Sequence, residues 1–95
     1  MLESVWVVLH DPAGSLGRHF EGLYHTAAAA QRDIDNRIAR SNEIARLRRV
    51  APTYQIVDDW HLWDLPSEVY LMTYAREDRP DELGLYSLQA YEVNE

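Results

Sequence analysis

The chemistry available to this chain is limited first by the residues it lacks. It has no cysteine, which excludes disulfides, thiolate metal ligands and thiol nucleophiles. All nine basic residues are arginine, so a Schiff-base lysine and the lysine of a phosphate-binding loop are excluded as well. Histidine, serine and carboxylate side chains remain to be considered.

The four histidines are His10, His19, His25 and His61. If the first two strands pair, His10 and His19 approach each other, and Asp11 would complete a three-ligand metal or acid–base set. However, none of the spacings typical of zinc sites, such as H-x-x-x-H or H-E-x-x-H, occurs. Histidines at loop ends are commonly just solvated, so we predict neither a metal site nor a cofactor.

Serine chemistry has equally little support. None of the five serines lies in G-x-S-x-G or another nucleophile elbow, and Ser41 and Ser67 are better explained as a helix cap and a turn residue. The run Gly14-Ser15-Leu16-Gly17 lacks the Gly-Lys pair of a phosphate loop and would join two strands. We therefore predict no catalytic residue.

The segment 58–64 combines carboxylates with aromatic rings, in the order Asp58, Asp59, Trp60, His61, Leu62, Trp63, Asp64. Such a combination can support general acid–base chemistry or sugar stacking. A small hydrolase using Asp59 and His61 is one alternative, although a 95-residue domain rarely provides a deep cleft. Alternatively, the tryptophans are anchors for a protein partner.

The elements that must position these residues follow an α+β pattern within a single domain, residues 1–95. Strands are predicted at 3–10, 18–24, 54–57, 68–75 and 85–93, with a helix after Thr26, an irregular segment at 58–67 and a charged turn at 76–82. This order, ββαβββ, predicts an antiparallel sheet of four or five strands with one long helix packed on one face.

The helix shows one apolar stripe, formed by Ala27, Ala30, Ile34, Ile38 and Ser41 at spacings of three and four. Ile44 and Leu47 fall off this stripe. The helix therefore either kinks or restarts near Ser41, or it continues and presents a second apolar edge.

Charge is distributed unevenly along the chain. Residues 26–50 hold six arginines against three acids, a net of +3, so the rest carries −10 to give −7 overall. The arginines are a solvated helix face in the simplest interpretation. Direct nucleic-acid binding is disfavoured because the acidic body would repel phosphates. In a third interpretation, the acidic body is a docking surface for a basic protein.

Seven of the ten aromatic residues and ten of the sixteen acids lie in the C-terminal half. One helix covers only one sheet face, yet both faces of the strand 68–75 look apolar: Tyr70, Met72 and Tyr74 alternate with Val69, Leu71 and Thr73. This favours dimerisation or partner binding, unless residues 58–67 fold over the second face.

The run VWVVLH followed by GLYHTAAAAQRDIDNRI resembles small uncharacterised hairpin–helix proteins of GC-rich bacteria and their phages. The resemblance covers only the N-terminal part and implies an origin rather than an activity. The first ten residues contain neither a signal peptide nor a membrane span, so we expect a cytoplasmic protein.

We therefore predict a small non-enzymatic protein-binding module. We expect a phage or mobile-element protein that inhibits or redirects a host protein with a basic, nucleic-acid-binding surface. The alternative is a homodimeric structural or regulatory domain. The predicted partner-binding residues are Asp58, Asp59, Trp60, His61, Trp63, Tyr70, Tyr74, Asp81 and Glu82.

Overall fold

A computed structural model describes residues 2–12, 17–49, 53–63 and 68–94. The elements are β1 (Leu2–Asp11), β2 (His19–Tyr24), α1 (Ala27–Arg48), β3 (Tyr54–Trp63), β4 (Val69–Arg76) and β5 (Arg79–Asn94). They confirm the predicted α+β class and the order ββαβββ.

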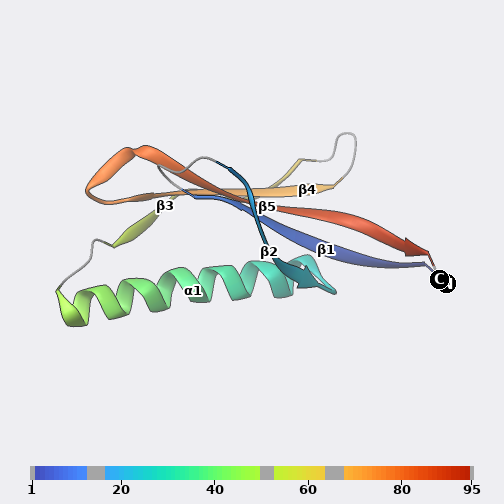
Figure 1. The fold of residues 1–95 in the computed structure, drawn as a ribbon, viewed down its shortest axis with the longest axis horizontal. Helices are drawn as coiled ribbons and strands as arrows, with labels where there is room; N and C mark the ends of the chain where they lie inside the picture. Colours follow the sequence, from blue (N-terminus) through green and yellow to red (C-terminus); the bar gives the residue numbers. More distant parts are fainter. Residues whose placement is uncertain (1, 13–16, 50–52, 64–67, 95) are drawn as a thin grey trace.

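All five strands form one antiparallel sheet in the order β2-β1-β5-β4-β3. The first and last strands are neighbours, so the two ends of the chain lie at the same end of the molecule (Figure 1). Helix α1 runs along one face of the sheet (Figure 1), and none of the described elements covers the other. We call these the covered face and the open face.

The helix begins where the sequence predicts. Thr26 has an extended backbone, and its hydroxyl accepts a hydrogen bond from the Ala29 backbone N–H at 3.1 Å, which satisfies one of the free donors of the first turn. Arg49 ends the helix in the left-handed conformation, with φ of 53°.

Helix α1 is continuous through Ser41, so it does not kink or restart there. The buried stripe simply extends by one further turn, to Ala45. Ile44 and Leu47 are 46% and 77% exposed. They form the second apolar edge that the sequence analysis gave as the alternative to a kink.

Two strands are longer than predicted. Residues 58–63 belong to β3 and are not an irregular segment, and β5 begins at Arg79 within the predicted charged turn. In β3, register shifts around Asp58 absorb extra residues while the ladder with β4 continues. The β4–β5 turn needs only Glu77 and Asp78, because Arg76 holds Asp78 through hydrogen bonds of 3.0 and 2.9 Å.

The core lies between α1 and the covered face. Its largest fully buried side chains are Val8, Ile34, Met72 and Leu88. Asn42 attaches the helix to the edge strand β3: its amide donates to the Tyr54 backbone carbonyl at 2.9 Å and accepts from the Tyr54 N–H at 2.7 Å. Among the described residues, no helix is long and apolar enough to span a membrane.

Candidate functional site

The open face is built from rows of directly paired residues that cross the sheet. One row runs Leu23, Val7, Gln89, Val69, Trp63, and the next runs Phe20, Leu9, Ser87, Leu71, His61. Neither row contains a carboxylate or a guanidinium. Strand alternation continues this surface to Val5 and Tyr91 on one side and to Leu83 and Leu85 on the other.

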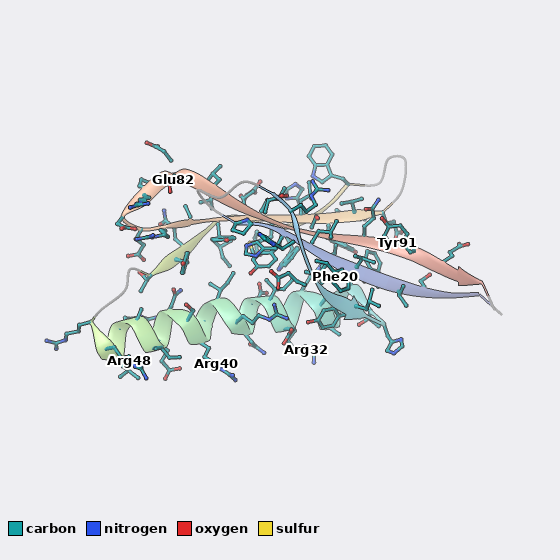
Figure 2. All side chains as sticks on the ribbon, viewed as in Figure 1. Phe20, Arg32, Arg40, Arg48, Glu82 and Tyr91 are labelled. Atoms are coloured by element: carbon teal, nitrogen blue, oxygen red, sulfur yellow. The ribbon has the colours of Figure 1, made fainter. Side chains whose placement is uncertain are left out.

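Several of these apolar side chains are strongly exposed. The exposed fractions are 63% for Phe20, 59% for Leu23, 57% for Trp63 and 53% for Leu83. Tyr91 is about half exposed on the part of β5 that extends past β4, where Figure 2 labels it. The apolar character predicted for both faces of β4 therefore extends to the other strands of the open face, although β5 contributes Ser87 and Gln89 at its centre.

Acidic residues lie at one end of the open face. Asp58 pairs with Thr73, which pairs with Leu85, so Asp58 lies in the row directly beside that of Leu71 and His61. Asp81 and Glu82 are exposed in the first part of β5, and Glu82 lies 3.7 Å from Arg79. Figure 2 shows Glu82 at this hairpin end. The structure thus places Asp58 beside the apolar rows, and Asp81 and Glu82 at the β4–β5 hairpin.

His61 and Trp63 also lie on the open face, opposite Leu71 and Val69. Asp59 is exposed, but its carboxylate accepts a hydrogen bond from the Trp60 backbone N–H at 2.8 Å. His61 Nδ1 lies 3.1 Å from the Asp59 backbone oxygen and 3.9 Å from Asp58 Oδ2. Among the described contacts, the Asp59 carboxylate therefore makes no hydrogen bond to His61.

Three of the predicted partner-binding residues lie instead on the covered face. Trp60 packs against the core and donates from Nε1 to Asp35 of α1 at 3.0 Å. The Tyr70 ring lies against Trp6, with centroids 5.5 Å apart, and Tyr74 is only 7% exposed. Because these rings contact the core, they cannot belong to the same exposed surface as Trp63.

The covered face holds a chain of polar side chains that the sequence analysis did not predict. His10 Nδ1 lies 3.0 Å from Glu21 Oε1, and His10 Nε2 lies 2.6 Å from the Tyr74 hydroxyl. An ionised Glu21 can only accept, so a neutral His10 donates from Nδ1 and accepts from Tyr74 through Nε2. This carboxylate–imidazole–phenol arrangement fixes the ring of His10.

A second group of polar side chains, from β2 and α1, lies next to the Glu21–His10–Tyr74 arrangement. Arg37 donates to Asp33 at 3.0 Å, to the Tyr24 hydroxyl at 3.3 Å and to Glu21 at 3.5 Å. The Tyr24 hydroxyl donates in turn to Asp33. This hydrogen bond lowers the pKa of Asp33 and raises the pKa of Tyr24, since it favours the ionised acid and the neutral phenol.

A pocket of about 240 Å³ opens between α1 and the covered face. Its sheet side is formed by the rings of His10, Tyr54, Tyr74 and Tyr86, and its helix side by Arg37, Ile38 and Ser41. The rings of His10 and Tyr86 are stacked, with centroids 4.0 Å apart and planes 7° apart. Burial raises the pKa of Tyr86 to about 12.

Gly84 is required by this arrangement. It pairs with Tyr74 across the β4–β5 ladder, and the Tyr74 ring lies directly over its backbone. A Cβ atom at Gly84 would come within 2.2 Å of Tyr74 Cζ. Only glycine allows this close approach of a ring to a neighbouring strand.

The predicted approach of the first two histidines is confirmed in part. His10 and His19 are directly paired between β1 and β2. However, His10 is held by Glu21 and Tyr74, and Asp11 is paired with Arg18 at 3.3 Å. Within the described ranges, no group of three His, Cys, Asp or Glu side chains is arranged to hold a metal ion.

Glu21 was missed because a bulge determines its position. The β1–β2 register shifts between Val8 and Leu9, whose partners are Gly22 and Phe20, so Glu21 has no partner in the ladder. The one signal in the sequence was the presence of His10, Tyr74 and Tyr86 at covered positions of predicted strands. Comparison with protein-family models, curated proteins and solved structures found no match.

Proposed function

We propose that this protein is a binding module that docks a protein partner on the open face of its sheet. The observation that carries this proposal is the largely apolar surface of five strands that α1 leaves uncovered, whose two central rows contain no carboxylate or guanidinium. With strands about 4.8 Å apart and paired rows about 7 Å apart, this surface measures about 500 Å² in projection. Patches of this size on single chains commonly mark interaction sites.

The partner proposed is a protein with an apolar contact surface and basic groups at one edge. The acids support this choice: Asp58 lies in the row beside the apolar rows, and Asp58, Asp59, Asp81 and Glu82 are all exposed. Arginine and lysine bind carboxylates as they bind phosphates. A more specific form of the proposal is therefore a phage or mobile-element inhibitor of a host protein that handles nucleic acids.

The alternative partner is a second copy of this chain. The two central rows favour it in one respect, since they contain no carboxylate or guanidinium that would be buried without a partner. Sedimentation of the wild type over a range of concentrations tests this alternative directly. A dimer that is lost in Leu23→Asp would identify the open face as the contact between copies.

The main experiment compares two double variants with the same chemical change. Leu23→Asp/Leu83→Asp places charge on the open face, whereas Ile44→Asp/Leu47→Asp places it on the exposed edge of α1. A protein captured from bacterial lysate by the wild type is purified, and its affinity for each variant is measured. We expect the open-face variant to lose about 100-fold or more in affinity, as for buried interface anchors, and the helix variant to bind normally.

A third variant tests the role of the acids. Asp58→Asn, Asp59→Asn, Asp81→Asn and Glu82→Gln together should weaken binding at low salt and reduce its dependence on ionic strength. If this variant binds as tightly as the wild type at every salt concentration, the basic partner is wrong. If the open-face variant also binds normally, the docking surface itself is wrong.

A further inference from the structure

The pocket on the covered side is distinct from the open face and has a different chemical character. The polar groups that line it are one guanidinium, one imidazole and four hydroxyls, those of Ser41, Tyr54, Tyr74 and Tyr86. Among the described residues, no carboxylate lines it. Glu21 contacts His10 at 3.0 Å and Arg37 at 3.5 Å, and Asp33 contacts Arg37 at 3.0 Å.

Most of these polar groups are hydrogen-bond donors with capacity left. Arg37 makes three hydrogen bonds to the described residues, and a guanidinium has five N–H donors. The hydroxyls of Tyr54 and Tyr86 make no hydrogen bond within the described part of the chain. No buried side-chain nitrogen or oxygen there lacks a partner, so these hydroxyls must reach the open space of the pocket. The raised pKa of Tyr86 keeps its hydroxyl protonated and able to donate.

The shape of the pocket limits what could enter. His10 and Tyr86 form a flat stacked pair, and Tyr54 meets Tyr74 edge to face with centroids 5.6 Å apart. These rings offer aromatic edges and faces to a planar group. The volume of about 240 Å³ is below the usual range for drug-sized ligands and suits a single ring with one small substituent.

We propose that this pocket binds a small aromatic carboxylate, with the carboxylate at Arg37 and Ser41 and the ring among His10, Tyr54 and Tyr86. Arg37 is the residue suited to the carboxylate because it is the one guanidinium among the described lining residues, and its Nε–H and one Nη1–H make no hydrogen bond to the described residues. Its side chain is 43% exposed, so a charged ligand group there would keep contact with water while the ring is buried.

The test is a titration of the full chain with benzoate and 4-hydroxybenzoate, followed by calorimetry and by NMR of the tyrosine rings. Benzamide, which has nearly the same shape but no charge, is the matched ligand control. We expect saturable binding of the carboxylates and about tenfold or more weaker binding of benzamide, because a hydrogen bond to a charged group contributes that much.

Two protein variants of equal charge separate a local contact from a general field. Arg37→Gln should weaken carboxylate binding about tenfold or more. Arg40→Gln removes the same charge from the outer side of α1, where the side chain is exposed and points away from the sheet (Figure 2), and should bind as the wild type does. Ser41→Phe, which places a ring at the helix wall, should abolish binding without unfolding the protein.

Three results would overturn the proposal. The first is the absence of saturable binding by folded wild-type protein with either carboxylate. The second is equal affinity for benzamide, which would remove the role of the charge. The third is an equal loss in Arg37→Gln and Arg40→Gln, since that would reflect only the overall charge of the helix.

Discussion

The two faces of the sheet are made from the same strands but differ in an unexpected way. The covered face combines fully buried aliphatic side chains with the polar rings of His10, Tyr74 and Tyr86, whereas the open face carries mainly apolar side chains, several of which are strongly exposed. Hydrophobic burial alone would place the aliphatic residues against the helix. Folding of a single chain therefore does not explain why apolar side chains remain exposed on the open face while polar rings lie against the helix.

The helix accounts for part of this difference. Its buried residues are Ala30, Ile34 and Ala45, which form a narrow stripe, so large rings from the sheet fill the space beside it. The polar ends of those rings then reach the pocket or the side chains of α1. Stability should accordingly depend mainly on the covered face, and association on the open face.

The comparison is tested most strongly by shortening one aliphatic side chain on each side. Ile34 is fully buried and Leu23 is 59% exposed. We expect Ile34→Ala to lower the free energy of unfolding by about 2–5 kcal/mol, through lost burial and a new cavity. Leu23→Ala should cost about 0.5 kcal/mol or less in dilute protein. Urea unfolding at low concentration measures both.

An equal loss in the free energy of unfolding for the two variants would contradict this distinction between the covered and the open face. It would mean that Leu23 is buried even in dilute solution. Repeating the unfolding at higher protein concentration sharpens the result, because a dimer formed through the open face would make the cost of Leu23→Ala rise with concentration.

The second prediction concerns the glycine beneath Tyr74. Gly84→Ala places a Cβ atom where the Tyr74 ring lies, so the ring must move and its contact with His10 is disturbed. We expect a loss of about 1–3 kcal/mol, typical of overpacking, together with a shift of the Tyr74 ring resonances. Gly22→Ala is the control, since its Cβ would meet only Tyr24 Cε2 at 3.5 Å, and it should be nearly neutral. Unchanged stability in Gly84→Ala would mean that the Tyr74 ring is not fixed.

The sequence was sufficient to predict the features that depend on local pattern. Thr26 as the helix cap, the alternation of Tyr70, Met72 and Tyr74 with the residues between them, and the order ββαβββ all follow from side-chain period and capping chemistry. Each of these signals is contained within about ten residues, and the structure confirms them.

Features that depend on strand register could not be predicted in this way. Bulges place Glu21 outside the β1–β2 ladder and keep residues 58–63 in β3, and a bulge inserts residues without a clear local signature. Trp60 and Trp63 look equivalent in the sequence, yet they lie on opposite faces. The pocket was missed for the same reason, since its walls come from five elements, β1, α1, β3, β4 and β5.

The smallest expected effect concerns the polar edge of the covered side, at Asp33. The hydrogen bond from Tyr24 holds the pKa of this carboxyl below its ordinary value of 3.8. A lowered folded-state pKa stabilises the fold above the unfolded-state pKa, and this contribution is lost as the pH falls through the folded-state value. Asp33→Asn should therefore cost a few tenths of a kcal/mol at about pH 6, as for other exposed pairs, and this cost should shrink as the pH falls below the ordinary value of 3.8.

Thermal or urea unfolding of both proteins across this pH range measures the difference. Glu43→Gln serves as the control, because Glu43 is exposed on the same helix and has no ion pair among the described residues, so its effect should depend little on pH.

At alkaline pH the same hydrogen bond acts through Tyr24, whose pKa it raises. Stability from a raised pKa is present below the ordinary value of 10.0 and is lost as the pH rises through the folded-state value. The cost of Asp33→Asn should therefore shrink at both ends of the pH scale, and a cost that is constant with pH would show that Tyr24 and Asp33 do not interact in solution.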